Sequence, residues 1–306
     1  MDGRTAEQRV WSSLPPEARR ALETELAPTD LQTLLMAVAR SRAQAVSPAR
    51  VLRRWQEDRF VRPSTCDPRR LAPVEARLWE LLPPSVAGVE LSPLAPLGTC
   101  SALGPVDQHR MVSTVRGTEV LSDPTNALAI EAADRRLRQR DSRVDVAACA
   151  RVVRAQRFAP GWSAHFPLFA MVSSARDTGS GRTEAQLLAD HIEYWQRVLA
   201  DWLPAGVPRI TVTVFDQPVL AERLHDTVLP ALAGGPVTVV EDPERTHGIG
   251  YYAGAAIGLR ADFPGETMDL GDGGLIDWTA KMLGDRKERA MASCISTERL
   301  TAAITR

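Results

Sequence analysis

Arginines are concentrated in one extended segment, residues 151–158, which reads RVVRAQRF. Side chains alternate along a strand, so Arg154 and Gln156 share one face while Arg151 lies on the other. An arginine on the inner face of a sheet is costly to bury unless it meets an anion. Arg154 is therefore a candidate phosphate clamp. This segment alone leaves open the alternative of an edge strand with solvated arginines.

Two glycine-rich segments could bring the main chain close to a ligand. Residues 244–254 read ERTHGIGYYAG, with glycines on both sides of Tyr251 and Tyr252, and residues 270–277 read LGDGGLID. Glycine has no Cβ and so permits close approach of the backbone. Neither segment fits the GxGxxG pattern of dinucleotide-binding folds or the GxxxxGK[ST] phosphate loop. The sequence argues against both of those classes, and each run taken alone is typical of a turn.

Strands and helices must position these residues, and both are predicted from residue 73 onward. Helical spacing and capping residues predict helices at 73–82, 125–140, 181–203 and about 296–305. Extended apolar runs predict strands at 86–98, 111–123, 148–158, 165–177, 209–215, 236–242 and 251–262. Short loops between several strands favour antiparallel pairing. We expect an α+β fold.

The first 70 residues have a different character from the remainder. Leucines repeat at helical spacing and five prolines divide the stretch into short pieces. The polar segment RPSTCDPRR then leads into the rest of the chain. We expect a helical N-terminal extension over residues 1–70 and a second domain over residues 71–306.

Composition excludes several classes of function. The 306 residues carry 37 basic and 38 acidic side chains, a net charge of −1 that argues against a general polyanion binder. The cysteines form no CxxC pair and predict no certain metal site; they are Cys66, Cys100, Cys149 and Cys294. No apolar run approaches the roughly 18 residues of a membrane span. We expect a cytoplasmic protein with reduced thiols that does not engage a membrane.

The order of these segments resembles the catalytic core of class II aminoacyl-tRNA synthetases. It is most similar to the histidyl-tRNA synthetase branch and its paralogue, the regulatory subunit of ATP phosphoribosyltransferase. Arg154-Ala-Gln156 and the loop to His165-Phe166 resemble motif 2, and residues 247–254 resemble the RGLDYYTG signature. Gly273-Gly274 and the later TERL at 297–300 resemble the GGRYD element and motif 3, and residues 88–96 resemble motif 1. The resemblance covers roughly residues 73–306.

This resemblance implies an antiparallel sheet flanked by helices, a homodimer, and ATP- and Mg²⁺-dependent formation of an acyl-adenylate. Arg154 matches the motif 2 arginine that holds the α-phosphate, and Arg299 matches the motif 3 arginine that reaches the γ-phosphate. The other implied ATP-binding residues are Gln156, His165, Phe166 and Asp272. The implied acyl-substrate pocket consists of Glu119, His247, Tyr251, Tyr252 and Gly273.

The sequence departs from that branch at several of these positions. His247 replaces an arginine, so a permanent charge becomes one that titrates near neutrality. Ser293 and Ser296 replace motif 3 glycines, and Leu168 and Val172 stand where the branch binds the histidine substrate. A polar substrate loses discrimination against apolar walls, which argues against histidine. The chain stops seven residues after the motif 3 arginine, from which we expect no anticodon-binding domain.

Together these features predict a stand-alone class II synthetase paralogue. We expect it to activate an amino acid or small carboxylic acid with ATP and to pass the acyl group to a non-decoding acceptor, whether a carrier, a small molecule or a tRNA. The alternative is a catalytically inactive regulatory subunit that binds an amino acid and controls a partner enzyme. A module that binds tRNA-like RNA through the N-terminal extension is a third hypothesis.

Overall fold

Eight strands pair into one mixed sheet in the computed structural model, which describes residues 4–158, 163–203 and 206–305. The strand order is β1-β4-β5-β10-β9-β8-β6-β7. All pairs from β4 to β6 are antiparallel, and the edge strands β1 and β7 join in parallel. The expected α+β class and the helix-flanked antiparallel sheet are confirmed, with a parallel pair added at each edge.

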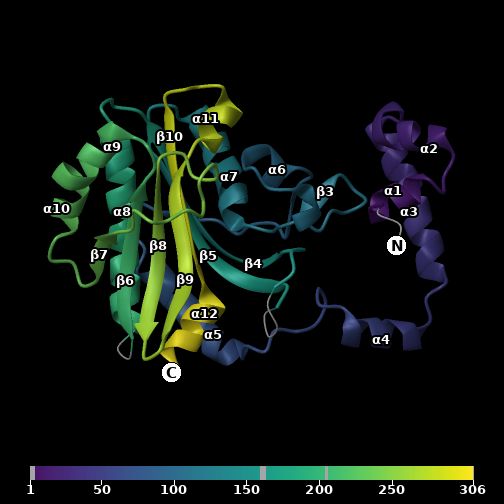
Figure 1. Ribbon diagram of the computed structural model, residues 1–306, viewed down its shortest axis with the longest axis horizontal. Coiled ribbons are helices and arrows are strands. Elements are labelled where there is room, and N and C mark those ends of the chain that lie inside the picture. Colours follow the sequence, from purple (N-terminus) through teal and green to yellow (C-terminus); the bar gives the residue numbers. More distant parts are fainter. Residues whose placement is uncertain (1–3, 159–162, 204–205, 306) are drawn as a thin grey trace.

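Figure 1 shows how the strands and helices of this body are arranged. The sheet strands are β1 (Ala87–Gly88), β4 (Val144–Val153), β5 (His165–Arg176), β6 (Val207–Val214), β7 (Thr238–Glu241), β8 (Ala255–Phe263), β9 (Glu266–Ile276) and β10 (Glu288–Ser296). A separate two-stranded sheet consists of β2 (Leu94–Pro96) and β3 (Thr118–Val120). The α-helices of the body are α5 (Pro68–Glu80), α6 (Thr99–Leu103), α7 (Pro124–Arg138), α8 (Arg182–Trp202), α9 (Pro218–Arg223), α10 (Leu229–Leu232), α11 (Trp278–Leu283) and α12 (Thr297–Ile304).

Helices cover both faces of the large sheet because its central strands are apolar on both sides. On β5, Phe169 and Met171 belong to the core that includes α5, α8 and α12. Their neighbours Ala170 and Val172 belong to the core beneath α7 and α11. Side chains alternate along a strand, so the two sets point to opposite faces. The cavity described below lies on the α7 side.

Strand β9 occupies the segment whose glycines suggested a turn. The glycines are required because neighbouring strands leave no room for a side chain. A Cβ on Gly271 would lie 2.1 Å from the Cys294 carbonyl oxygen, and one on Gly274 would lie 2.4 Å from that of Ala255. Close backbone approach therefore explains this glycine run. Strand β10 and the helices between residues 218 and 232 were also not predicted.

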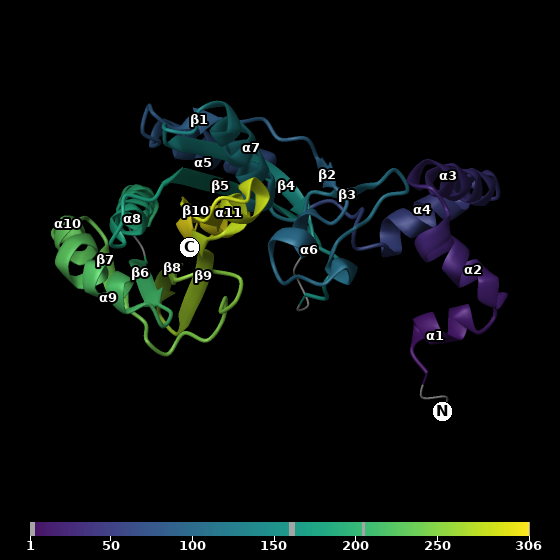
Figure 2. The ribbon, with the colours of Figure 1, turned by 90° about the horizontal axis from the view of Figure 1, so that it is seen from above.

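The first part of the chain forms short helices that lie away from the sheet. They are α1 (Ala6–Trp11), α2 (Pro16–Arg20), a π-helical turn (Ala21–Glu25), α3 (Pro28–Gln44) and α4 (Pro48–Glu57). No residue described in these helices is buried. Figures 1 and 2 both show them projecting from the body.

The segment that follows α4 ties this extension to the body. The Arg59 guanidinium donates to the carbonyl oxygens of Ala155 and Gln156, at 2.5 and 2.6 Å. Ser64 donates to a carboxylate oxygen of Glu298 at 2.8 Å. Residues 59–64 therefore contact both the end of the β4 segment and the start of α12. We call this segment the strap.

Candidate functional site

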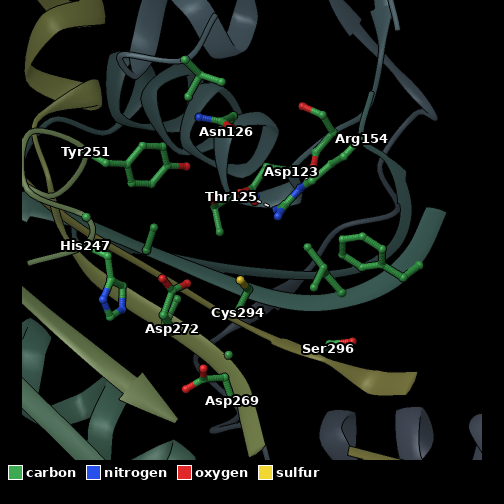
Figure 3. Close-up of a pocket in the computed structure, with 18 of the residues that line it drawn as sticks. Asp123, Thr125, Asn126, Arg154, His247, Tyr251, Asp269, Asp272, Cys294 and Ser296 are labelled. Carbon is green, nitrogen blue, oxygen red and sulfur yellow. Dashed lines mark hydrogen bonds and ion pairs between the residues drawn. The ribbon is translucent and has the colours of Figure 1, made fainter. Parts of the chain in front are cut away.

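A cavity of about 560 Å³ opens on the α7 face of the sheet. Strands β5, β8, β9 and β10 contribute to its floor, and the first turn of α7 and the loop before β8 contribute to its walls. Small-molecule sites in proteins are typically about 300–1,000 Å³. The cavity is thus large enough for a nucleotide or an acyl substrate. Figure 3 shows residues that line this cavity.

Arg154 enters this cavity directly after the end of β4. The backbone N–H of Arg154 donates to the Ala164 carbonyl at 2.8 Å, which keeps the residue beside β5. Its Nε donates to the Ser122 carbonyl at 2.9 Å, and a terminal nitrogen lies 3.3 Å from Asp123 Oδ2. The guanidinium also lies 5.3 Å from the centre of the Phe166 ring. Burial alone would lower the pKa of Arg154, but nearby groups, led by the Asp123 carboxylate, outweigh it and raise that pKa.

Arg299 reaches the same cavity from the first turn of α12. The Ser296 hydroxyl caps this helix by accepting from the Arg299 N–H at 3.4 Å. One terminal nitrogen of Arg299 donates to the Asp269 carbonyl at 2.8 Å. Burial lowers the pKa of Arg299, and the positive charge of Arg154 lowers it further. The structure therefore brings these two sequence-predicted arginines to one cavity, with their charges interacting.

Aromatic rings form the opposite end of the cavity. The Tyr251 ring packs edge-on against Tyr252 and Trp278, with centroids 5.1 and 5.2 Å apart. Both tyrosine N–H groups donate to the Gly248 carbonyl, at 3.1 and 2.9 Å. Burial raises the pKa of both hydroxyls well above their usual value, so they remain neutral at physiological pH. Both tyrosines line the cavity, together with His247.

Asp272 projects into the cavity from β9 and is backed by an arginine that the sequence did not indicate. Arg245 has no exposed side-chain surface, and one of its nitrogens lies 3.5 Å from Asp272 Oδ2. Its other nitrogens donate to the carbonyls of His247 and Ile257. Burial raises the pKa of Asp272 even though Arg245 acts to lower it. Arg245 lies two residues before His247, and its burial depends on the loop conformation, which sequence spacing does not reveal.

Asp123, Thr125 and Cys294 also line the cavity and were not among the predicted site residues. Asp123 caps α7, since its carboxylate accepts from both the N–H and the hydroxyl of Thr125, at 3.0 and 2.7 Å. Cys294 lines the cavity from β10, and burial raises the pKa of its thiol well above the usual value. The Asp-Pro-Thr sequence at 123–125 is a recognisable helix start and was the available sequence signal for Asp123 and Thr125.

Of the other predicted ATP-binding residues, Gln156 and Phe166 line the cavity and His165 does not. His165 accompanies Phe166 on β5 but does not line the cavity; its ring contacts the Arg62 carbonyl at 2.6 Å and Arg151 at 3.0 Å. Side chains alternate along β5, so His165 points away from the cavity that Phe166 lines.

Glu119 and Gly273 are also outside the cavity lining. The Glu119 carboxylate is buried and accepts from the N–H groups of Gly98 and Cys100, at 2.9 and 3.2 Å. Glu119 therefore holds the start of α6 in place. Gly273 faces the other side of the sheet, where a Cβ would lie 2.4 Å from the Ser293 Cβ.

The architecture is that of the class II aminoacyl-tRNA synthetase-like fold. No protein-family model matches the sequence, and no curated protein matches it. An ATP phosphoribosyltransferase regulatory subunit/histidyl-tRNA synthetase from Bacillus halodurans C is similar in structure, with a TM-score of 0.61 and 13% identity over 80% of this chain and 82% of that chain. Histidyl-tRNA synthetase from S. aureus has a TM-score of 0.57 and 15% identity, over 78% of this chain and 65% of that chain.

A histidine–tRNA ligase subunit from Alicyclobacillus acidocaldarius is also similar, with a TM-score of 0.57 and 14% identity over 79% of this chain and 95% of that chain. These similarities show the fold. They confirm the resemblance on which the site predictions were based. Within the described residues, no helix has the length and apolar character to cross a membrane.

Proposed function

We propose that the protein activates an amino acid or small carboxylic acid with ATP to form an acyl-adenylate. The observation that carries this proposal is the presence of Arg154 and Arg299 in one cavity, each delivered by the structural element that the resemblance assigns to it. Phe166 lines the cavity beside Arg154 and is the aromatic side chain that would contact the adenine ring. The Tyr251 end of the cavity is left for the acid.

The chemistry requires positive charge at the phosphates rather than a nucleophile from the protein. A carboxylate oxygen of the acid attacks the α-phosphorus, and the bond from that phosphorus to the bridging oxygen of pyrophosphate breaks. Negative charge grows on the phosphate oxygens as the reaction proceeds. Fixed guanidinium groups in a partly buried cavity stabilise that charge. Arg154 would act at the α-phosphate and Arg299 at the γ-phosphate.

Mg²⁺ is expected to accompany ATP. The described residues include no group of three or more acidic, histidine or cysteine side chains arranged to hold a metal ion. Mg²⁺ commonly keeps several waters and takes phosphate oxygens as ligands. We therefore assign no step to a protein-bound ion and expect phosphate oxygens of ATP and water molecules to supply most of the Mg²⁺ ligands.

A regulatory subunit that binds an amino acid without activating it is the second candidate. The interactions of Arg154 favour it, because Asp123 and the Ser122 carbonyl already occupy part of the guanidinium. Histidine at position 247 also removes a permanent positive charge from the acyl end. Under this hypothesis the cavity binds an acid, but its affinity for the phosphates of ATP is too low for catalysis.

Pyrophosphate exchange across a panel of amino acids and small carboxylic acids separates the two candidates. Exchange of labelled pyrophosphate into ATP with any acid supports activation. Ligand-induced thermal stabilisation without exchange supports the regulatory candidate, because binding to the folded state alone raises the melting temperature. If no acid gives either exchange or thermal stabilisation, the result contradicts both the activating enzyme and the regulatory subunit.

We propose a homodimer and a cytoplasmic location, with residues 1–70 as an extension to a catalytic unit of residues 71–306. The acceptor of the acyl group would be a carrier, a small molecule or a tRNA. Analytical ultracentrifugation tests the dimer directly.

A further inference from the structure

Asp272 presents a partly open carboxylate to the acyl end of the cavity. Its side chain is 44% exposed, and Figure 3 shows it near His247 and Cys294, with Arg154 on the far side of the cavity. The cation behind it, Arg245, is fully enclosed and does not line the cavity. Their nitrogen–oxygen distance of 3.5 Å is beyond the normal range of a hydrogen bond. One side of the carboxylate is therefore left facing the cavity.

The other two carboxylates of the cavity lie closer to a cation than Asp272 does. Asp123 accepts from Thr125 and lies 3.3 Å from Arg154. Asp269 accepts from the Arg260 Nε at 3.0 Å. Asp272 is thus the cavity carboxylate whose charge is least compensated by a close cation. Burial raises the pKa of Asp272, although Arg245 and a hydrogen bond with the Tyr252 side chain act to lower it.

We propose that Asp272 receives a protonated amine of the substrate acid, either its α-ammonium or a side-chain ammonium, in place of the ATP contact that the family resemblance implies for it. The inference rests on the proposed function only in taking this cavity as the place where the acid binds. An ammonium group donates charge-assisted hydrogen bonds to a carboxylate and is also attracted by an aromatic ring such as that of Tyr251.

The distribution of charge orients such a substrate. Arg154 and Arg299 repel an ammonium and attract phosphate and carboxylate groups. Asp272 attracts the ammonium at the tyrosine end. The amine therefore points toward β9, and the reacting carboxylate points toward Arg154. This is the orientation that attack on the α-phosphorus requires.

Four five-carbon acids test the inference in the absence of ATP. Pentanoate has no amine, L-norvaline has an α-amine, 5-aminopentanoate has a terminal amine, and L-ornithine has both. Their dissociation constants for the full-length protein are measured by isothermal titration calorimetry. At least one amine-bearing acid should bind about 10- to 100-fold more tightly than pentanoate. L-Norvaline and 5-aminopentanoate report which amine is received.

The Asp272→Asn variant should remove most of that preference while leaving pentanoate binding nearly unchanged. Asp262→Asn is the matched control, because Asp262 lies on neighbouring β8 outside the cavity and pairs with Arg209. Equal binding of all four acids overturns the inference, as does an amine preference that survives in Asp272→Asn. Absence of binding by all four acids also contradicts it. If Asp272→Asn fails to fold, equal binding of the four acids by the wild-type protein still overturns the inference.

Failure of this inference and failure of the proposed function give different results. Amine-dependent binding without pyrophosphate exchange supports the Asp272 site and contradicts activation. Exchange that is as strong with pentanoate as with its amine-bearing analogues supports activation and contradicts the Asp272 site.

Discussion

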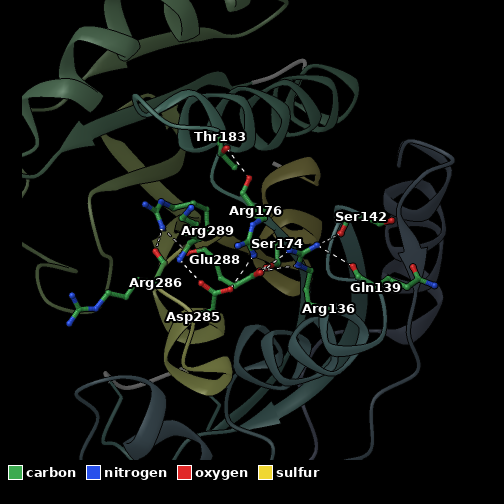
Figure 4. Close-up of polar contacts among 11 residues, drawn as sticks. Arg136, Gln139, Ser142, Ser174, Arg176, Thr183, Asp285, Arg286, Glu288 and Arg289 are labelled. Atoms are coloured by element: carbon green, nitrogen blue, oxygen red, sulfur yellow. Dashed lines mark hydrogen bonds and ion pairs between the residues drawn. The ribbon is translucent and has the colours of Figure 1, made fainter.

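Arg136 and Glu288 form a two-pronged ion pair inside the protein, between α7 and the first residue of β10. The Arg136 Nε and a terminal nitrogen lie 2.9 and 2.7 Å from the two carboxylate oxygens. The remaining terminal nitrogen donates to the carbonyls of Gln139 and Ser142 (Figure 4). The guanidinium side chain has no exposed surface. This pair fixes the end of α7 to the sheet, while the start of α7 lines the cavity.

Breaking this pair should destabilise the fold strongly. Glu288→Ala leaves the Arg136 charge buried without its counterion, which typically costs about 3–5 kcal/mol. Urea unfolding followed by circular dichroism measures the loss. The double variant Arg136→Met/Glu288→Leu should recover much of it, because no unpaired charge remains. As a control, Asp285→Ala breaks the exposed pair with Arg176 and should cost far less. Equal losses in Glu288→Ala and Asp285→Ala would contradict the assignment.

His191 should make stability depend on pH. Its ring lies within the fold between Ser293 and Ser173, at 2.7 and 3.0 Å, and burial lowers its pKa to about 3. The folded state keeps the ring neutral while the unfolded chain binds a proton below about pH 6.5. Stability is therefore full above pH 6.5 and falls by about 1.4 kcal/mol per pH unit as pH drops toward 3.

Chemical denaturation of wild type and His191→Gln at pH 7 and pH 5 measures this contribution. The difference between the two pH values should be larger in wild type by about 2 kcal/mol. Comparison with the variant removes the contribution of carboxylates that titrate in the same range. An identical pH dependence in both proteins would show that the imidazole is not held neutral.

Gly274→Ala should distort the tyrosine end of the cavity. A Cβ at Gly274 would lie 2.6 Å from the Tyr252 ring and 2.4 Å from the Ala255 carbonyl oxygen, and neither can move freely within the sheet. Overpacking of this kind costs about 1–3 kcal/mol. Gly254→Ala is the control, because its nearest neighbour would be Leu220 at an ordinary 3.5 Å. Thermal denaturation and acid binding should both change in the first variant and remain near wild type in the second.

The strap should affect nucleotide binding more than stability. Arg59→Ala removes the two hydrogen bonds to the Ala155 and Gln156 carbonyls, adjacent to Arg154. We expect ATP affinity to fall about 2- to 10-fold, since these contacts hold the turn that carries the phosphate-binding side chain. Arg62→Ala is the matched control, because the Arg62 side chain donates to the Gln56 carbonyl oxygen within the extension. Equal ATP affinity in both variants would remove the strap from the site.

Strong periodicity made much of the fold predictable. The apolar runs at β5 and β6 and the long amphipathic pattern at α8 appear at the expected positions. Strand β9 was missed because its glycines carry no hydrophobic signal, and their reason is contact with β8 and β10, which only the assembled sheet reveals. The short helices near residue 224 include a π-helical turn, Leu224–Val228, which has no simple sequence period.

The site was predictable where a motif determines position. Arg154 and Arg299 lie at the end of β4 and the start of α12, and both reach the cavity. The motif 2 resemblance also assigned His165 together with Phe166 to the ATP site, but neighbouring residues of a strand face opposite ways, and only Phe166 lines the cavity. Arg245 could not be found from spacing, since its role depends on the path of the loop before β8.

ATP affinity of the Arg154→Ala and Arg299→Ala variants tests the central claim most directly. Isothermal titration calorimetry with Mg²⁺-ATP requires no knowledge of the acid or the acceptor. We predict that each substitution weakens ATP binding by about 10- to 100-fold, because each removes charge-assisted hydrogen bonds to phosphate. Circular dichroism should show that both variants remain folded. Wild-type affinity in both folded variants would contradict a shared phosphate site.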